Sequence, residues 1–410
     1  MQKTKLKKYA ELIVRTGVAV QKGQEVIIQA SLDQPEFVRM VVKEAYKAGA
    51  KKVTVEWHDQ AVEKLTMKHA SLATLSTVED WVVTKWERKV EVLPCMIYLE
   101  SDDPDGLSGV DPVKMGKARQ ATGKVIKPIR NKMENKYQWC IAAVPGEKWA
   151  KKVFPDCKKK EAVERLWEAI LFASRVDDQP LLAWEKHNAN LKARYEYLNR
   201  LHLKSLHYTG DNGTDLHVGL LPEGMFLGGG EHTLGSHIYY NPNIPTEEIF
   251  CSPNKDLTEG IVYATKPLSY RGQLIENFYL RFEKGRVVEA HAEKGQEALD
   301  SLLSVDEGAR RLGECALVPV HSPISELGIL FYETLFDENA ACHLALGMGF
   351  QDCIRDFGNL KKEDFDKMGL NDSIVHEDFM IGYPGLSIVG ETIDGKTVQI
   401  FKNGEWAFEI

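Results

Sequence analysis

The first 144 residues alternate between short apolar runs typical of strands and longer amphipathic stretches typical of helices, and this alternation constrains the fold most. The expected strands are residues 25–30, 52–57, 90–99 and 138–144, and the expected helices between them are residues 35–48, 78–88 and 112–133. Strands joined by helical connections form βαβ units, in which the strands pair in parallel. The sequence therefore predicts an N-terminal α/β domain with a mainly parallel sheet over residues 1–180.

A helical stretch follows from residue 160 to about residue 202, and its second part, residues 181–202, is expected to connect two domains. Beyond it the pattern changes to short alternating runs separated by turn dipeptides, which are Asn212-Gly213, Asp394-Gly395 and Asn403-Gly404. Because such dipeptides supply the positive φ angles of tight hairpins, they favour antiparallel sheet. We expect an α+β C-terminal domain, rich in antiparallel sheet, over residues 203–410.

The glycines of the sequence do not support a nucleotide-binding function. The first expected strand is followed by Ser-Leu-Asp-Gln at residues 31–34, and not by GxGxxG or by a phosphate-binding GxxxxGK[ST] loop. The triple glycine at residues 228–230 follows no clear βαβ unit, and a loop with unusual φ angles explains it. Neither feature indicates a dinucleotide cofactor.

Charge and cysteine content argue against a nucleic-acid-binding protein and against a protein held by disulfides or by a thiolate zinc site. The 52 Lys and Arg residues against 60 Asp and Glu residues give a formal charge of −8, and beyond the lysine-rich start little indicates a nucleic-acid partner. The seven cysteines are odd in number, scattered and never arranged as CxxC, which favours reduced thiols over disulfides or a thiolate zinc site. We find neither the pattern of a signal peptide nor an apolar run of about 18 residues. We therefore expect a cytoplasmic protein without membrane contacts.

The segment from Ile374 to Gly382 is an apolar, strand-like run interrupted by His376, Glu377 and Asp378. Residues two apart in a strand project from the same face, so His376 and Asp378 should point together while Glu377 points away. An imidazole and a carboxylate that converge from one strand supply half of a site for a divalent metal. The alternative is an edge strand with one solvated polar face, and this segment alone does not decide between the two.

Three further residues are candidate ligands, and each also has an ordinary structural explanation. His343 lies among small apolar residues after a polar turn, where a lone histidine is more often a core residue than a ligand. Glu314 leads directly into an apolar run, where burial of its charge is costly without a partner or a metal. Glu248 follows Thr246 in a segment that also suits a helix start. No HExxH, GxSxG or other compact catalytic motif accompanies them.

The combination of these segments is informative although each one is ambiguous. The segments TEEIF, RLGE, LFDENAACHLALG and HEDFMIG occur in this order, GTDLHVGL and PEGMFLGGGE precede them, and HSPIS lies between RLGE and LFDENAACHLALG. Together they resemble the aminopeptidase T / aminopeptidase S family of metallopeptidases along nearly the whole chain. The resemblance implies a metal-dependent aminopeptidase that hydrolyses the N-terminal peptide bond of short peptides. It also implies a catalytic C-terminal domain and a homodimer with the site inside an internal cavity.

Carried over position by position, the resemblance implies metal ligands at Glu248, Glu314, His343, His376 and Asp378. Three carboxylates and two imidazoles suit two divalent ions such as zinc, cobalt, manganese or magnesium, and the lack of thiolates disfavours a structural zinc. Such ions activate a water and polarise the scissile carbonyl, while Glu314 or Glu248 would carry the proton to the leaving amine. The sequence does not decide between these two glutamates.

One position departs from the family pattern. Seven residues after His343, where the family has a tyrosine beside the metals, this sequence has Phe350. Either the position tolerates both rings, or the missing hydroxyl lowers the catalytic rate without affecting metal binding. Two alternatives therefore stay open: a catalytically weak scaffold that binds metal and peptide, and a two-metal hydrolase of another ester or of a phosphate.

Overall fold

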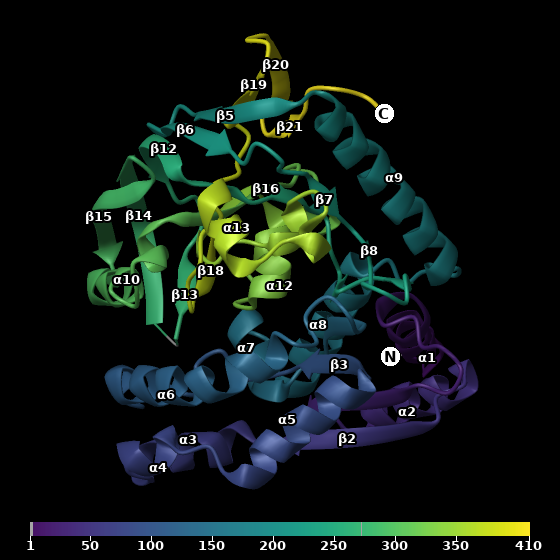
Figure 1. Cartoon of the computed structure of the whole chain (residues 1–410). Coiled ribbons are helices and arrows are strands. Elements are labelled where there is room, and N and C mark those ends of the chain that lie inside the picture. The colour runs from purple at the N-terminus through teal and green to yellow at the C-terminus, as the bar shows by residue number, and fades with distance from the viewer. Residues whose placement is uncertain (1–2, 272) are drawn as a thin grey trace. The chain divides into compact units, whose positions relative to one another are not determined.

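The computed structural model describes residues 3–271 and 273–410, and Figure 1 follows the chain from purple at the N-terminus to yellow at the C-terminus. The chain divides into two compact units. Unit 1 comprises the described residues up to Lys186 together with Gly230–Pro245, and unit 2 comprises His187–Gly229 together with Thr246–Ile410. This division differs from the expected domain limits of 1–180, 181–202 and 203–410, because residues 230–245 belong to unit 1. The first boundary also falls inside a single helix, α9 (Pro180–Arg200).

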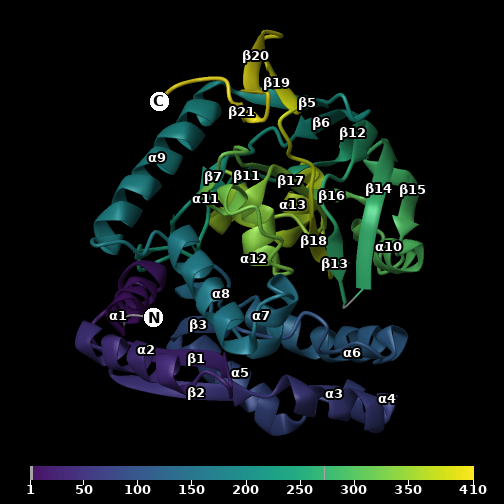
Figure 2. The same ribbon diagram turned by 180° about the vertical axis from the view of Figure 1, so that it is seen from behind.

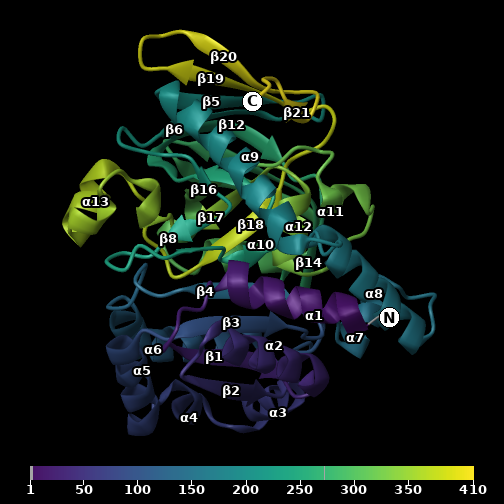
Figure 3. The same ribbon diagram turned by 90° about the vertical axis from the view of Figure 1, so that its right-hand side faces the viewer.

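Unit 1 contains a five-stranded sheet in the order β10-β4-β3-β1-β2, in which every pairing is parallel. The strands are β1 (Glu25–Ser31), β2 (Lys52–His58), β3 (Cys95–Glu100), β4 (Trp139–Ala143) and β10 (Asn243–Ile244). Figure 3 shows β4, β3, β1 and β2 one below another in this order. The prediction of a mainly parallel N-terminal sheet is confirmed, and the pairing of β10 with β4 explains why residues 230–245 join unit 1.

Helices cover both faces of this sheet. The crossings from β1 to β2 and from β2 to β3 run in opposite directions, so right-handed connections put α2 (Pro35–Ala48) and α5 (Asp80–Val92) on opposite faces. Tyr9 of α1 (Lys3–Leu12) stacks on Phe37 of α2 with ring centroids 5.5 Å apart, and Trp167 of α8 (Lys159–Ala173) meets both rings. On α5, Lys89 pairs with Glu56 of β2 at 3.3 Å.

The strand predicted at residues 90–99 is wrong in its first part, because α5 continues to Val92 and β3 begins at Cys95. Leu93 adopts a left-handed conformation with φ of +48°, and the following Pro94 cannot continue a helix. Two helices that the sequence did not indicate, α3 (Gln60–His69) and α4 (Leu72–Ser76), precede α5. Unit 1 also contains α6 (Pro112–Arg130), α7 (Glu147–Val153) and the pair β8 (Glu231–His232) and β9 (Tyr239–Tyr240).

Unit 2 contains two antiparallel sheets, which confirms the prediction of a C-terminal part rich in antiparallel pairing. The nine-stranded sheet runs in the order β13-β14-β12-β6-β5-β19-β20-β21, and β15 also pairs with β14. Its strands are β5 (Leu203–Thr209), β6 (Asp215–Leu220), β12 (Pro253–Tyr263), β13 (Leu268–Tyr270), β14 (Gln273–Glu283), β15 (Arg286–Lys294), β19 (Ser387–Thr392), β20 (Thr397–Lys402) and β21 (Glu405–Trp406). The five-stranded sheet of unit 2 runs in the order β18-β17-β16-β11-β7. Its strands are β7 (Leu227–Gly228), β11 (Ile249–Cys251), β16 (Leu312–Leu317), β17 (His343–Gly347) and β18 (His376–Met380).

The two sheets of unit 2 enclose its main hydrophobic core. Tyr208 from the nine-stranded sheet and Leu344 from the five-stranded sheet belong to the same buried cluster. Phe278 of β14 touches Phe379 of β18 with ring centroids 5.8 Å apart. The helix α10 (Gln296–Leu303) lies beside β14 and β15, as Figure 2 shows, and adds Leu299 to the core. The sheets therefore pack face to face, and each keeps one outer face.

The three dipeptides that predicted tight turns all lie in hairpin connections. Gly213, with φ of +97°, lies in the β5–β6 connection, and Gly395, with φ of +83°, lies in the β19–β20 connection. In the β20–β21 turn both Asn403 and Gly404 have positive φ angles, of +55° and +73°. This is the conformation that Asn-Gly favours in a two-residue hairpin.

The short helices of unit 2 are α11 (Pro323–Glu326), α12 (Thr334–Asp337) and α13 (Lys362–Met368). Among the helices of residues 3–271 and 273–410, none combines the length and the apolar character that a membrane span requires. All seven cysteines lie in the described residues, and all are free.

Candidate metal centre

Adjacent strands of the five-stranded sheet in unit 2 bring four of the predicted ligands to one face. Ala345 of β17 pairs with Asp378 of β18 on one side and with Glu314 of β16 on the other. His343 lies two residues before Ala345, and His376 two residues before Asp378, so both imidazoles project from this face as well. The small side chain of Ala345 leaves the space between the two carboxylates open.

The opposite face of the same strands belongs to the hydrophobic core. Leu344 and Leu346 of β17 and Phe379 of β18 are buried there. Glu377 pairs with Leu346 and therefore lies on this second face, in the register expected from the sequence. Burial raises the pKa of the Glu377 carboxyl to about 8, and the neighbouring charge of Asp378 adds to the shift.

Three contacts join the imidazoles to the carboxylates. His343 Nε2 lies 3.2 Å from an oxygen of Glu248, which directly precedes β11. His376 Nε2 lies 3.0 Å from Glu314 Oε2 and 3.3 Å from Asp378 Oδ1. The structure thus brings together all five residues that the sequence indicated, and four of them are almost fully buried while His376 keeps partial exposure.

The other ring nitrogen of each histidine faces a backbone carbonyl. His343 Nδ1 lies 3.1 Å from the oxygen of Ala341, and His376 Nδ1 lies 2.7 Å from the oxygen of Met348. A carbonyl only accepts hydrogen bonds, so Nδ1 must carry the proton in both rings. In a neutral ring this leaves the lone pair on Nε2 directed at the carboxylates, which is the orientation found in metal-binding histidines.

Burial and mutual contact shift the pKa values of the cluster. Burial raises the pKa of Glu314 to about 7, and the charges of Asp378 and Glu248 contribute to this rise. The contact with His376 lowers the pKa of Glu314 and only partly offsets the rise. Burial by itself lowers the pKa of His343, but the contact with Glu248 outweighs burial and raises it to about 9. For Asp378, burial raises the pKa, but the adjacent His376 and His343 bring it below its ordinary range. Positive charge is therefore strongly favoured inside this cluster.

Glu338 is a sixth member of the cluster that the sequence did not indicate. It lies in the short 3₁₀ turn Glu338–Ala340, two residues before β17, and it forms a candidate ligand group with His343 and Asp378. Burial raises the pKa of Glu338 well above its ordinary value, and the charges of Asp378, Glu248 and Glu314 raise it further. The only hint in the sequence was its place five residues before His343, in a segment where Asp337 and Glu338 are equally plausible ligands.

The side chains present fit divalent cations. Two further groups, Glu248 with Glu314 and His343, and Glu314 with His376 and Asp378, also have ligand atoms within 4.8 Å of one another. Oδ1 of Asp378 is buried and, within the described residues, has no hydrogen-bond partner, although His376 Nε2 is near. A buried carboxylate oxygen without a donor is costly unless a cation binds it. Oxygen and imidazole nitrogen atoms together suit zinc, cobalt or manganese.

The segments before β11 and β17 are held together by one buried amide. The backbone N–H of Glu247 donates to Asn339 Oδ1 at 2.7 Å, and Asn339 Nδ2 donates to the oxygen of Leu335 at 2.9 Å. Because Glu247 precedes Glu248 and Asn339 follows Glu338, this amide fixes the backbone beside two carboxylates of the cluster.

Phe350 lies beside the cluster. Its ring centroid is 4.8 Å from that of His376 and 5.5 Å from that of Phe250. The backbone N–H of Phe350 donates to Ser252 Oγ at 2.8 Å, which fixes the position of the ring.

Comparison with known proteins identifies the family. The sequence profile of the family described as Thermophilic metalloprotease (M29) matches residues 2–406. This chain belongs to the M29 family of metalloproteases. It is 44% identical to aminopeptidase AmpS of Bacillus subtilis and 40% identical to aminopeptidase T of Thermus thermophilus, in each case over 98% of both chains. The structure of wild-type AmpT from Thermus thermophilus matches with a TM-score of 0.91 and 40% identity, covering 99% of this chain and 100% of that one.

The resemblance stated from the sequence is thus confirmed, and so are the fold class and the assignment to the metallopeptidases among the hydrolases. Membership of this family also implies the use of a divalent metal, for which the cluster around Ala345 supplies candidate ligands.

Proposed function

We propose that this protein removes the N-terminal residue from short peptides, with two divalent ions held by Glu248, Glu314, His343, His376 and Asp378. The observation that carries the proposal is the convergence of four of these side chains on one face of a sheet, with Glu248 reaching His343 from the segment before β11. The chain's membership of a metalloprotease family and its similarity to proteins named aminopeptidases support this reading.

Two ions are supported by the overlap of the candidate ligand groups. Glu314 belongs both to the group with Glu248 and His343 and to the group with His376 and Asp378. A carboxylate with two oxygens could serve two positions, and both Glu314 and Asp378 belong to two groups, so we propose that one of these two would be the shared ligand. Glu338 would be an additional ligand near His343 and Asp378. Divalent ions in this place supply a nucleophile at neutral pH by acidifying water, and they polarise the scissile carbonyl.

The side chains of the protein have three roles in this proposal. His343 and His376, fixed through Nδ1 by backbone carbonyls, present Nε2 without reorganisation. Glu314 or Glu248 carries the proton to the leaving amine. Phe350 packs against His376 and excludes water from that side.

Glu314→Gln and Glu248→Gln distinguish the two glutamates as proton carriers. Both variants should bind metal more weakly, because both glutamates are proposed ligands. At saturating metal the variant of the proton carrier should still lack kcat, whereas the variant of a residue that only binds metal should regain it. Elemental analysis alongside steady-state kinetics separates these outcomes.

A cavity of unit 2 is our candidate for the site that holds the far end of a short peptide. It has a volume of about 370 Å³ and is lined by Ala341, whose carbonyl faces His343, and by Lys266 and Tyr383. Burial lowers the pKa of Lys266, and the charge of Asp337 partly offsets this shift. We propose that Lys266 binds the C-terminal carboxylate of a short peptide. Lys266→Met should then raise KM for dipeptides about tenfold and leave KM for their C-terminal amides unchanged.

A panel of free and N-blocked dipeptides tests the peptidase proposal directly. Turnover of the free-amine peptides alone supports it, and tight peptide binding without turnover would favour a scaffold instead. Turnover of esters or phosphates but not of peptides would favour another hydrolase. A homodimer and a cytoplasmic location remain our predictions, and sedimentation equilibrium measures the first.

A further inference from the structure

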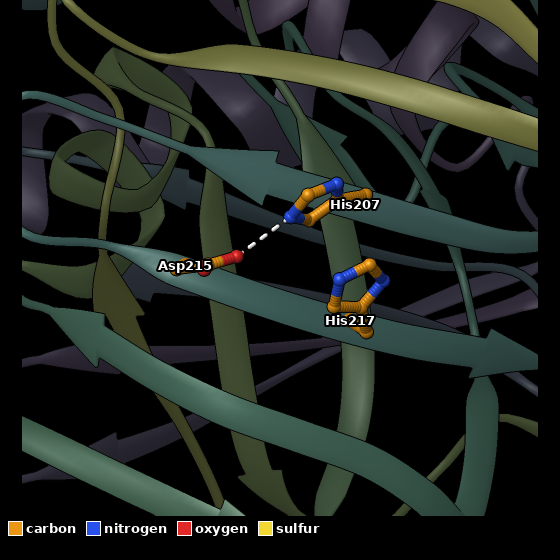
Figure 4. Close-up of side chains that lie close together, drawn as sticks. All are labelled: His207, Asp215 and His217. Atoms are coloured by element: carbon orange, nitrogen blue, oxygen red, sulfur yellow. Dashed lines mark hydrogen bonds and ion pairs between the residues drawn. The ribbon is translucent and has the colours of Figure 1, made fainter.

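A second cluster of metal-binding side chains lies on the nine-stranded sheet. His207 of β5 and His217 of β6 are direct cross-strand partners, and Asp215 lies two residues before His217. Their neighbours Tyr208 and Leu216 are buried in the core, so the three polar side chains project from the outer face of the sheet. Figure 4 shows the three side chains lying close together on the two adjacent strands. None of them takes part in the candidate metal centre, which lies on the other sheet of unit 2.

The three side chains already have the spacing of a ligand set. The rings of His207 and His217 stack with centroids 3.7 Å apart and planes 15° apart, and His207 Nε2 lies 2.7 Å from Asp215 Oδ1. One ligand atom from each residue lies within 4.8 Å of the other two. A neutral imidazole offers a lone pair on one ring nitrogen, which is the atom that binds a metal. The hydrogen bond with His207 lowers the pKa of Asp215, which keeps the carboxylate ionised.

The backbone beneath the cluster is fixed. β5 and β6 pair with each other, β19 pairs with the other edge of β5, and β12 pairs with the other edge of β6. The turn that joins them is closed by a hydrogen bond from the N–H of Thr214 to Asn212 Oδ1 at 3.0 Å, and Tyr383 donates to Asp211 at 2.6 Å. Binding of an ion therefore requires only rotation of side chains on the outer face of the sheet, which costs less than ordering of a loop.

We propose that His207, Asp215 and His217 form a surface site for one exchangeable divalent transition-metal ion, separate from the catalytic ions. Two imidazoles and one carboxylate select zinc, nickel, copper or cobalt over magnesium and calcium, which require mainly oxygen ligands. Asp215 and His217 are exposed, so solvent completes the coordination sphere. The ion links neighbouring strands of the sheet, and its role is to stabilise unit 2 and not to bind substrate.

Calorimetric titration of the metal-loaded, desalted enzyme with Ni²⁺ tests the site, with elemental analysis to verify that the ions already bound stay in place. The wild type should bind one additional ion. His217→Gln should weaken this binding at least tenfold, and so should Asp215→Asn, which keeps the side-chain shape and removes the charge. His69→Gln, at an exposed histidine on α3, is the matched control and should bind as the wild type does.

Electron paramagnetic resonance of one added equivalent of Cu²⁺ provides a second readout that does not depend on affinity. Two nitrogen ligands are expected in the wild type and one in His217→Gln. The proposal is overturned if the variants bind the additional ion as tightly as the wild type, if the nitrogen count does not change, or if the added ion replaces those already present. Thermal unfolding without added metal should be the same for the variants and the wild type, because the substituted side chains are exposed.

Discussion

Substitution of Asp378 should reduce metal binding far more than substitution of its neighbour Glu377. Asp378 belongs to two of the three ligand groups of the candidate metal centre and lies 3.3 Å from His376 Nε2. In the described part of the chain Glu377 belongs to none of them, and its partner Leu346 lies in the core. Asp378→Asn and Glu377→Gln both replace a carboxylate by an amide of nearly the same size, so they isolate the effect of charge on each face of β18.

The expected magnitude follows from the position of each side chain. Loss of a group that only orients a metal ligand costs about 10- to 100-fold in affinity. Loss of a ligand carboxylate should therefore cost at least about 100-fold, or about 2.7 kcal/mol at about 1.36 kcal/mol for each factor of ten. Glu377→Gln should change the affinity less than about threefold, because its side chain projects from the opposite face.

Competition with a chromogenic chelator measures both affinities in desalted protein, with circular dichroism as the check on folding. Equal losses in the two variants would refute the register of β18 and the assignment of its outer face to the metal. Loss in Glu377→Gln alone would reverse the assignment of the two faces.

Three other outcomes are expected, two from the metal-binding cluster and one from Glu377 on the opposite face of β18. Chelation should abolish activity and Zn²⁺ or Co²⁺ should restore it, because ions held by oxygen and imidazole ligands can exchange. Full turnover in verified metal-free protein would contradict the dependence on metal. Phe350→Tyr should raise kcat up to about a hundredfold, or about 3 kcal/mol, because a hydroxyl beside His376 adds a hydrogen-bond donor for the oxyanion. The metal content should not change. An unchanged kcat in a folded variant would argue against this role of the hydroxyl. Glu377→Gln should raise the unfolding free energy of metal-free protein by about 1–3 kcal/mol near pH 7 and hardly change it near pH 4. The Glu377 carboxyl has a pKa of about 8 in the folded protein against an ordinary value of 4.5, so at pH 7 it must take up a proton on folding, which costs free energy that glutamine does not. Denaturant unfolding of the variant and the wild type at both pH values measures this cost.

The fold was predictable where local patterns decide it. The alternation of strands and helices defines β1, β2 and β4, and the Asn-Gly and Asp-Gly turns mark hairpins, because both are short-range properties of the backbone. The sequence-based predictions are wrong where apolar residues typical of a strand lie in a helix, and where two strands far apart in the sequence pair with each other. Val90 and Val92 resemble a strand but end α5, since only Leu93 and Pro94 stop the helix. β10 has two residues, and its place beside β4 depends on a pairing about 100 residues away in sequence.

The candidate site was predictable only in part for the same reason. The register of β18 follows from its own alternation, which predicts that His376 and Asp378 share a face. The meeting of Glu314 with His376 depends on both strands pairing with β17, and no local pattern encodes that pairing. Glu338 was missed because its segment before β17 has no periodic pattern, so nothing separates it from Asp337 in the sequence.

The two clusters of unit 2 should bind metal independently of each other. The candidate metal centre lies on the outer face of the five-stranded sheet, since Leu344 and Leu346 occupy its inner face. His207 and His217 lie on the outer face of the nine-stranded sheet, since Tyr208 occupies its inner face. The hydrophobic core thus separates the two, and they share no side chain. Sites without shared partners contribute additively, so occupancy of the surface site should leave the affinity of the candidate metal centre unchanged. If Ni²⁺ at the surface changed that affinity, the core between the sheets would have to transmit the effect, and the two outer faces would not be independent.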